Sequence, residues 1–206
     1  MRRTSADAAR TRAAILRTAL TVFARRGFAA ATLAEIGAAA GLTRGAVYHH
    51  FSDKADLYLA AVTEGWTGVL DRLGPDLAGP ADPADVLTGF VAAFYTALHD
   101  DPAFGELLTV TVAGLDAPAP ATAGYDIKAK ALSGLLRQLT DLCERLADAG
   151  RLPAGVTPLS AARVVLASLS GAVLLRALDP GLVFDGPSGV VELTAATLRG
   201  VLAHPT

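Results

Sequence analysis

The chain has 206 residues, of which 52% are apolar and 18% charged, and its formal net charge is −2. This length suffices for one large domain or two small ones, and the mean hydropathy of +0.41 is high for a soluble protein. The longest stretch without a charged residue, 86–99, has fourteen residues, whereas a membrane span needs about 18. No signal-peptide segment is recognisable at the start. We therefore expect a soluble, cytoplasmic protein without a membrane partner, whose apolar surplus lines an oligomer interface, a pocket or both.

Charge is distributed unevenly along the chain. Residues 1–54 hold nine Lys or Arg and three acidic side chains, a formal charge of +6, whereas the remaining 152 residues carry −8. A basic head on an acidic body is typical of a nucleic-acid binder with a separate partner domain, because the head attracts phosphate and the body repels it. Cys143 is the only cysteine, which excludes an intrachain disulfide and a thiolate metal cluster, and we expect it to be buried.

All the predicted elements are helices, because Ala, Leu and Arg are frequent and apolar residues recur every three to four positions. The first helix is expected over about residues 7–26. Ile15, Ala19 and Phe23 lie on its apolar face, and Gly27 is expected to end it.

The next two helices are short. A Thr-x-x-Glu capping box formed by Thr32 and Glu35 starts a helix over about residues 33–40. Thr43 is an N-cap candidate for a third helix over about residues 44–51.

The rest of the chain alternates Gly- and Pro-rich breaks with longer helices. Ser52 is expected to cap the fourth helix. These helices are expected over about residues 53–73, 84–99, 102–115, 125–149, 158–178 and 188–203. The sequence therefore predicts an all-α fold of about nine helices.

The second and third helices are spaced as a helix-turn-helix requires. Two short helices that cross steeply need a small residue where they touch, and Gly37 supplies it. The turn needs a positive φ, which Gly41 adopts readily, and Val47 anchors the second of the two helices. Ile36 and Leu42 complete the small core. The third helix then carries side chains suited to reading the major groove.

The segment from Thr11 to about Val62 resembles the N-terminal module of the TetR family of transcriptional regulators. The matching marks are Ile15-Leu16 with Ala19, Phe23 before Gly27-Phe28, Thr32-x-x-Glu35-Ile36, Ala40-Gly41-Leu42-Thr43-Arg44-Gly45, Val47-Tyr48-His49-His50-Phe51 and Lys54-x-Asp56-Leu57. A match of this extent is far more specific than a bare helix-turn-helix pattern. It implies a three-helix DNA-binding domain over residues 1–54 and an effector-binding and dimerisation domain over residues 55–206.

The resemblance also implies contacts with the DNA backbone. Thr32, Tyr48 and Lys54 stand at positions where the family contacts phosphate. For Thr32 this agrees with elementary electrostatics, because the N-terminus of a helix favours an anion.

Sequence readout is expected from the third helix. Arg44 is the candidate for a bidentate bond to guanine. Thr43 suits a phosphate or a base edge, His49 suits a phosphate or a base, and Gly45 lets the backbone approach the groove closely.

Structural alternatives accompany several of these positions. Tyr48 and His50 also suit a packing role, and Gly45 suits a simple need for a small residue. The arginines at positions 2, 3, 10 and 12 form either an arm near the minor groove or a solvated basic tail.

Residues 164–175 lie in one predicted helix and are apolar on every side, so we expect them to be buried on every side. A dimer interface achieves this, and Ala167, Gly171 and Ala172 allow close helix approach. In the TetR family the last two helices of each subunit form a four-helix dimer bundle. The resemblance thus implies a homodimer that reads a palindromic operator in double-stranded DNA.

The second domain resembles, through less specific marks, the AcrR-type branch, whose members often repress multidrug efflux pumps. The marks are Asp100-Asp101-Pro102, Ala149-Gly150-Arg151-Leu152, and Gly171 followed by Leu178-Asp179-Pro180. They imply a small lipophilic effector and control of an efflux pump, although Arg176-Ala177 replaces an aromatic that is frequent in that branch, which leaves the ligand class open. The candidate pocket residues, for each of which ordinary core packing is the alternative, are Trp66, Phe90, Phe94, Thr111, Leu115, Leu136, Cys143 and Ser168.

The sequence also bears on three other classes of protein: enzymes, nonspecific DNA-binding proteins and activators. Nucleotide-binding, serine-hydrolase and metalloprotease motifs are absent from the sequence, so no enzyme, cofactor or metal site is expected. A nonspecific architectural DNA-binding protein would need basic charge over much of its surface, and the −8 body argues against it. That class and an activator of the same fold are the alternatives.

Overall fold

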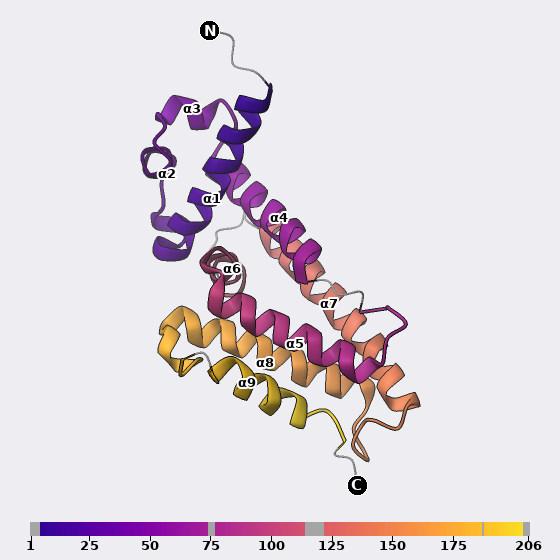
Figure 1. The fold of residues 1–206 in the computed structure, drawn as a ribbon. Helices are drawn as coiled ribbons and strands as arrows, with labels where there is room; N and C mark the ends of the chain where they lie inside the picture. The colour runs from indigo at the N-terminus through magenta and orange to yellow at the C-terminus, as the bar shows by residue number, and fades with distance from the viewer. Residues whose placement is uncertain (1–4, 74–76, 114–121, 187, 204–206) are drawn as a thin grey trace. The chain divides into compact units, whose positions relative to one another are not determined.

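The structure is a computed structural model that describes residues 5–73, 77–113, 122–186 and 188–203. Every regular element within these ranges is a helix, which confirms the all-α fold class (Figure 1). Packing divides the chain into two compact units. Unit 1 comprises Met1–Thr67 and Glu106–Lys128, and unit 2 comprises Gly68–Gly105 and Ala129–Thr206. The functional boundary expected after residue 54 stays a prediction.

Unit 1 contains the predicted helix-turn-helix. Its elements are α1 (Ser5–Ala30), α2 (Leu33–Ala39), α3 (Arg44–Tyr48), the first part of α4 (Lys54–Leu73), the end of α6 (Pro102–Leu108), the π-helical turn η1 (Thr109–Ala113) and the start of α7 (Thr122–Asp148). Ile15, Ala19, Ile36, Val47 and Leu57 are fully buried in its core. The burial agrees with the helical spacing of apolar residues in the sequence.

Helix α1 is interrupted at Gly27, where its first stretch was expected to end. Gly27 has φ 72° and ψ 166°, a conformation that only glycine adopts without strain, so the helix kinks there and a short helical turn follows. The turn brings the Phe28 ring against Phe23, with 5.9 Å between the ring centroids. Tyr58 of α4 lies edge-on to both rings, at 5.3 Å from Phe23 and 5.2 Å from Phe28. Three aromatic rings thus join α1 to α4.

The segment expected as one helix over residues 102–115 is two elements. Helix α6 ends at Leu108, and η1 winds more widely as a π-helical turn. The Thr111 hydroxyl is buried and donates to the backbone carbonyl oxygen of Leu107. Alternating Thr and Val side chains occupy this turn, and β-branched residues weaken a regular α-helix. Val110 in the same turn accepts a 3.3 Å hydrogen bond from the Tyr58 hydroxyl on its carbonyl oxygen.

Unit 2 is a bundle of α5 (Pro83–Asp100), the rest of α7, α8 (Pro158–Leu178), the short 3-10 helix η3 (Pro180–Leu182) and α9 (Ser188–Arg199). Helix α5 packs on α9 and on α8. The fully buried Tyr95 donates or accepts a 3.0 Å hydrogen bond with the Thr197 hydroxyl, which joins α5 to α9. Leu98, Leu142 and Leu146 are fully buried around the same core.

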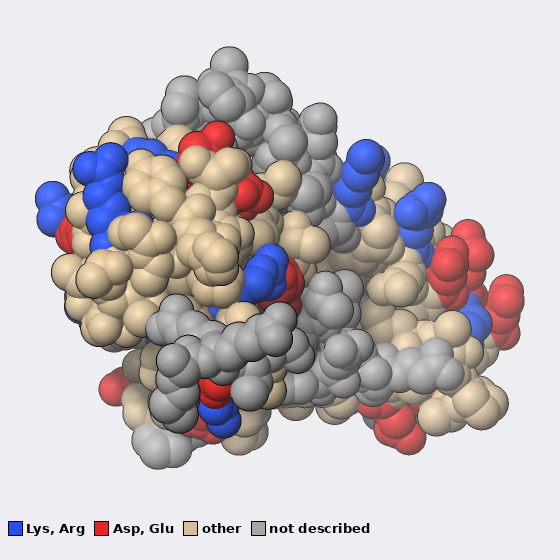
Figure 2. All heavy atoms as spheres, turned by 90° about the horizontal axis from the view of Figure 1, so that it is seen from above, with Lys and Arg blue, Asp and Glu red and all other residues tan. Residues whose placement is uncertain are grey.

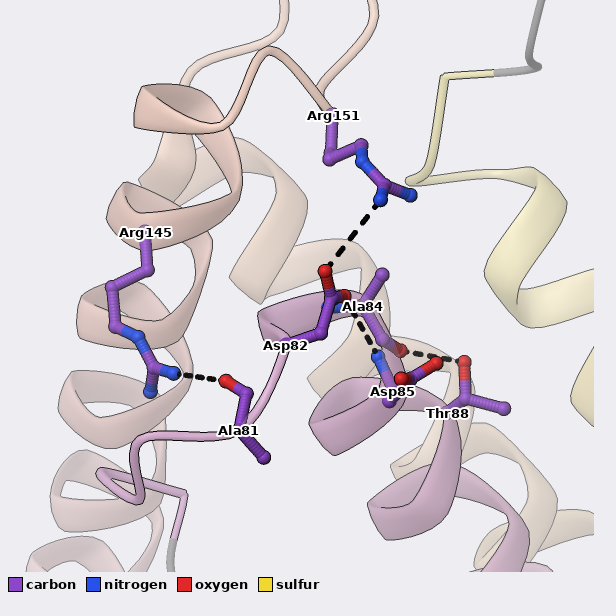
Figure 3. A network of polar contacts seen from close by, with 7 residues as sticks. All are labelled: Ala81, Asp82, Ala84, Asp85, Thr88, Arg145 and Arg151. Atoms are coloured by element: carbon purple, nitrogen blue, oxygen red, sulfur yellow. Dashed lines mark hydrogen bonds and ion pairs between the residues drawn. The ribbon is translucent and has the colours of Figure 1, made fainter.

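Hydrogen bonds and an ion pair connect residues 77–82, which precede α5, with the end of α7 and the residues after it (Figure 3). Arg145 of α7 donates to the carbonyl oxygens of Leu77 at 3.1 Å and Ala81 at 2.8 Å. Asp82 caps α5 by accepting the Ala84 amide at 2.9 Å, and its other carboxylate oxygen lies 3.5 Å from Arg151. The Arg145 bonds order a Gly- and Pro-containing segment that makes no regular structure of its own.

Helix α8 is buried on one side only in the single chain. Ala161, Val165 and Leu169 point into unit 2, whereas Leu174 and Leu178 remain 48% and 72% exposed. By length and composition alone, α8 is also the one helix among the described residues that could cross a membrane. The uncharged run within it is too short for a span, but the whole helix passes because only Arg163 and Arg176 interrupt its apolar residues. The core helix of a soluble protein passes the same test.

Candidate DNA-binding site

The start of α2 is held by Thr32. This residue has extended backbone, and its hydroxyl oxygen accepts the Glu35 amide at 3.2 Å. This bond is one of the two that make up a capping box. In the other, the Glu35 carboxylate would accept the Thr32 amide, but here it accepts a 2.8 Å bond from Arg26. The ion pair ties α1 to α2, and the Thr32 side chain remains exposed at the helix N-terminus. An exposed helix N-terminus is where an anion is favoured.

The turn between α2 and α3 depends on two glycines. Gly41 has φ +69°, in the region that favours glycine. At Gly37 an added Cβ would lie 3.1 Å from the Cγ2 of Val47, so a larger residue would push α3 away from α2. Val47 is fully buried at this contact. The two glycines and Val47 therefore serve as the sequence predicted.

Helix α3 presents its N-terminal end to solvent. Thr43 is its N-cap, with the hydroxyl oxygen accepting the Ala46 amide at 3.2 Å. Gly45 is exposed, and a Cβ there would have only the Thr43 hydroxyl nearby, at 3.9 Å. Packing within this chain therefore does not require glycine at position 45.

Arg44 and Tyr48 form a pair one helical turn apart. The guanidinium Nη2 lies 3.2 Å from the Tyr48 hydroxyl oxygen, and its Cζ lies 5.2 Å from the centre of the ring. Both side chains are exposed, Tyr48 by 45%. A packing role in the core is therefore ruled out for Tyr48 in the single chain. His49 is exposed at the C-cap of α3, and its ring lies edge-on to the half-buried His50.

The start of α4 differs in detail from its expected form. The helix begins at Lys54, and Asp53 rather than Ser52 provides the N-cap, accepting the Asp56 amide at 2.8 Å. Ser52 instead donates its own amide to the Asp56 carboxylate at 2.9 Å. Ser52 and Asp53 are both residue types that cap helices, and their spacing in the sequence does not decide which of the two neighbours does so.

Lys54 makes contacts that the sequence did not predict. Its ammonium donates to the carbonyl oxygens of Phe28, Ala29 and Ala31 at 2.7, 3.0 and 2.8 Å. It also lies 4.6 Å above the centre of the Phe28 ring.

The first basic residues are partly placed. Arg12 of α1 pairs with Glu64 of α4, and its Cζ lies 5.3 Å from the centre of the Phe51 ring. It therefore joins α1 to α4. Arg10 pairs with Asp7 on the same helix. Both positions are helical, and the arginines at positions 2 and 3 lie outside the described residues.

Positive charge is spread over unit 1. The exposed arginines include Arg17, Arg25 and Arg26 on α1 and Arg44 on α3. Seen from above, the described basic side chains stand among uncharged and acidic ones (Figure 2). Attraction to phosphate therefore comes from several separate charges, with helix N-termini adding to it.

The residues expected to line a pocket fall in both units. In unit 1, Trp66 is half-buried on α4, and its indole Nε1 is buried with no hydrogen-bond partner among the described residues. Thr111 is buried in η1, and Leu115 lies outside the described residues. In unit 2, Phe90 and Phe94 of α5 are buried.

The other three expected pocket residues are also in unit 2. Leu136 is half-buried on α7, and Cys143 is fully buried there. Burial raises the pKa of the Cys143 thiol to about 11, so the group stays protonated and unreactive at neutral pH. The Ser168 hydroxyl donates to the Val164 carbonyl oxygen at 2.9 Å within α8.

The chain is helical and carries a helix-turn-helix formed by α2 and α3. Thr43 caps α3, Val47 anchors it in the core, and its N-terminal end faces solvent. Residues 15–61 match the family described as bacterial regulatory proteins, tetR family. This match identifies the segment 15–61 as similar to the tetR family of regulators.

Curated relatives match over part of the chain. The chain is 53% identical over 62 residues to the HTH-type transcriptional repressor BepR of Brucella suis biovar 1 (strain 1330), which covers 30% of each protein. It is 42% identical over 88 residues to the HTH-type transcriptional regulator AcrR of Shigella flexneri, which covers 42% of this chain and 40% of AcrR. The matched segments thus span less than half of these relatives.

Solved structures extend the similarity to nearly the whole chain. NalD, the secondary repressor of the MexAB-OprM multidrug efflux pump in Pseudomonas aeruginosa, is 26% identical, with a TM-score of 0.77 over 97% of this chain and 100% of NalD. SmeT in complex with triclosan is 27% identical, with a TM-score of 0.74 over 94% of this chain and 92% of SmeT.

Proposed function

We propose that the protein is a ligand-responsive transcriptional repressor that binds a palindromic operator as a homodimer. The observation that carries this proposal is the exposed end of α3, where Thr43, Arg44 and Tyr48 stand on a module fixed by Gly37 and Val47. Side chains at the N-terminal end of such a helix read base edges in the major groove. BepR and NalD are both named as repressors, which supports repression over activation.

The direct test is binding to DNA from the protein's own promoter and the adjacent intergenic region. Salt of about 0.15 M and excess nonspecific competitor suppress binding by charge alone. We expect tight binding to one near-palindrome and a loss of about 10- to 100-fold in Arg44→Ala, since a bidentate contact to guanine contributes ~1–3 kcal/mol. Arg17→Ala removes an exposed arginine from α1 and is the matched control. Equal, weak binding to all sequences would favour the architectural alternative.

We propose dimerisation through α8 and α9. Leu174, Leu175 and Leu178 of α8 and Val191 of α9 are 43–72% exposed in the single chain. Burial between two copies would remove them from water, a gain of roughly 25 cal/mol per Å² of apolar surface. A two-fold axis would also present two α3 helices to the two halves of a palindrome.

Sedimentation tests the dimer. The double substitution Leu175→Glu with Leu178→Glu is expected to give a folded monomer at concentrations where the wild-type chain is dimeric. Ala147→Glu, on an exposed residue of α7, is a control for added charge. A monomeric wild-type chain that floats with lipid vesicles would overturn the proposal and assign α8 to a membrane.

A small lipophilic effector is proposed to release the DNA. The buried Trp66 Nε1 supports a binding site near α4, because an unpaired buried donor costs about 1–3 kcal/mol until an acceptor reaches it. SmeT, a protein of similar fold, has been solved with triclosan, which makes triclosan a suitable first probe. Trp66 is the only tryptophan, so its fluorescence reports occupancy without interference.

The effector hypothesis requires two linked results. Triclosan or a related probe should change Trp66 fluorescence and, in the same concentration range, weaken operator binding, since only differential affinity shifts a two-state equilibrium. Trp66→Phe should weaken probe binding with operator affinity retained. Tight probe binding that leaves operator affinity unchanged would contradict the switch.

We further propose that the protein acts in the cytoplasm as a regulator without enzymatic activity and controls an efflux pump. The name of NalD supports the choice of target, since that repressor acts on a multidrug efflux pump. Deleting the gene should raise the transcript of an adjacent pump gene. A fall in that transcript would indicate an activator.

A further inference from the structure

A charged residue, Arg176, interrupts the buried stripe of α8. Val165, Leu169 and Ala172 of this stripe follow one another at intervals of four and three residues, and each is buried. Arg176 stands four residues further on, so it lies on the same face of the helix. Its side chain is half-buried, and the exposed leucines of α8 that are proposed to meet a second copy lie outside this stripe. An arginine therefore occupies a position where the pattern of α8 calls for an apolar side chain.

Gly105 leaves the room that the guanidinium group of Arg176 occupies. Both residues belong to unit 2, Gly105 in the first part of α6. A Cβ added at Gly105 would lie 2.0 Å from Nη1 of Arg176, 2.5 Å from Cζ and 2.9 Å from Nη2. The guanidinium group thus fills the space that a side chain at position 105 would need, and glycine permits this close approach to the backbone.

Arg176 differs from the other half-buried basic residues in having no partner of its own. Arg12 pairs with Glu64, Arg145 donates to two backbone carbonyl oxygens, and Lys54 donates to three. Within the described ranges, no acidic side chain or carbonyl oxygen pairs with Arg176. Removal of a charge from water is unfavourable unless a partner compensates for it. The position therefore calls for an anionic group from outside the described residues.

The chemistry around Arg176 indicates which anion fits. A guanidinium group binds a carboxylate or a phosphate through two parallel hydrogen bonds. The residues next to it are apolar: Val173 precedes it by three positions on α8, and Phe104 is the neighbour of Gly105 on α6. Phe94 of α5 lies edge-on to Phe104, with 5.4 Å between the ring centroids. An anion attached to an apolar chain suits these surroundings better than a hydrated inorganic ion does.

We propose that Arg176 binds the anionic head group, a carboxylate or a phosphate, of an amphiphilic effector, and that Gly105 holds the guanidinium group in place. The proposal rests on the effector-dependent function proposed above. It narrows the small lipophilic effector to one that carries a negative charge.

Calorimetric titration without DNA tests the charge of the ligand. The probes are dodecanoate, dodecyl phosphate and the neutral dodecanol. We expect at least one anion to bind more tightly than dodecanol, and Arg176→Met to weaken its binding by about 10- to 100-fold, because a charge-assisted pair is lost. Dodecanol should bind the wild type and Arg176→Met alike. Arg163→Met removes an exposed arginine from the same helix and should bind the anions as the wild type does.

The relative affinities of the probes separate the possible outcomes. Tighter binding of dodecanoate or of dodecyl phosphate distinguishes a carboxylate from a phosphate ligand. Equal affinity of the anions for the wild type and Arg176→Met would overturn the inference, as would tighter binding of dodecanol, which would support a neutral effector. Binding of none of the three probes would also overturn it, while operator binding, measured separately, would still decide the DNA-binding function.

Gly105→Ala tests the contact that holds the guanidinium group. The added methyl group would meet only the far end of the flexible Arg176 side chain, so the guanidinium group should move while the helix keeps its place. Anion binding should therefore weaken toward the level of Arg176→Met. Gly89→Ala is the matched control, because a Cβ at this exposed glycine of α5 would meet nothing within 4 Å. Unchanged anion binding in Gly105→Ala would contradict the role of Gly105.

Urea unfolding and sedimentation of the ligand-free protein separate binding from a structural role of Arg176. Methionine needs no partner at a buried position, so Arg176→Met should unfold at the same urea concentration as the wild type or at a higher one. If Arg176 instead paired with an acidic side chain of a second copy, Arg176→Met would unfold at a lower urea concentration and dissociate more readily. That result would overturn the inference without any probe.

Discussion

The helix-turn-helix of unit 1 and the bundle of unit 2 are stabilised over different distances along the chain. In unit 1 the Thr32 and Thr43 hydroxyls each accept an amide three residues away. In unit 2, the Tyr95–Thr197 bond joins residues 102 apart, and the Arg145–Ala81 bond joins residues 64 apart. The comparison teaches that the starts of α2 and α3 are specified by local rules, whereas the contacts that join distant helices, in unit 2 and between Tyr58 and Val110 of unit 1, follow no local pattern.

The largest effect is expected from a cavity made in each unit. Ile36 in unit 1 and Leu142 in unit 2 are both fully buried. Ile36→Ala and Leu142→Ala should each lower the free energy of unfolding by about 2–5 kcal/mol, because lost contacts add to an unfilled cavity. Urea unfolding followed by circular dichroism measures the loss. A change below about 1 kcal/mol in either variant would show that the site collapses around the smaller residue.

A smaller effect is expected at Gly41, in the turn between α2 and α3, and at Gly45 on α3. Gly41→Ala should cost about 1–2 kcal/mol, since φ is +69° there although no neighbour would touch the added Cβ. Gly45→Ala should leave stability unchanged or raise it slightly but weaken operator binding, because the methyl group would meet the DNA. Thermal unfolding and operator titration of both variants separate the two roles. If Gly45→Ala bound the operator normally, Gly45 would simply be a small residue.

Two helix caps of equal geometry sharpen the comparison. Thr32 accepts the Glu35 amide at 3.2 Å, and Thr157 accepts the Ser160 amide at 3.2 Å at the start of α8. Thr32→Ala and Thr157→Ala should each cost about 1 kcal/mol of stability. Only Thr32→Ala should also reduce operator affinity in a titration. Equal losses of affinity in both variants would indicate a general effect of stability on binding.

The last effect appears only at alkaline pH and concerns the titration of Cys143 in unit 2. Its pKa is about 11 in the folded chain, against an ordinary value near 9. The folded state therefore keeps the thiol proton to higher pH than the unfolded state, and stability should fall as pH rises from about 9 to about 11. Unfolding of the wild type and Cys143→Ala across this range measures the difference. Rapid reaction of the native thiol with a maleimide at pH 7 would contradict the burial.

The sequence predicted unit 1 well because its devices are short-range. Gly37, Gly41, Thr43 and Val47 stand at spacings that only a helix-turn-helix demands, and the structure uses each as expected. The partners of charged side chains were not predictable in this way. The Glu35 carboxylate accepts a hydrogen bond from Arg26, in place of the Thr32 amide that a capping box would supply. Nothing in the spacing of Arg26 and Glu35 along the chain indicates this contact.

The long helices were less predictable. The apolar run of α8 was expected to be buried all round with the help of a dimer interface; the single chain buries one side, and the cover for the other side stays a prediction. The segment ending at η1 reads as one helix by composition, yet its β-branched residues and the Thr111 hydroxyl favour a wider turn. For Lys54, the bonds to backbone carbonyl groups depend on the fold around Gly27, which its position in the sequence does not reveal.

In the proposed dimer, the exposed side of α8 links operator binding to the abundance of the chain. Leu178 is 72% exposed in the single chain, and in the proposed dimer its burial waits for a second copy. The concentration of dimer then rises with the square of the concentration of free chain, so occupancy of a two-half-site operator is steeper in expression level than it would be for a monomer. Where free chain predominates and the operator is far from saturation, halving the copy number of such a protein would lower operator occupancy to about a quarter. Variation in the rate of synthesis of the chain would likewise produce a proportionally larger variation in operator occupancy.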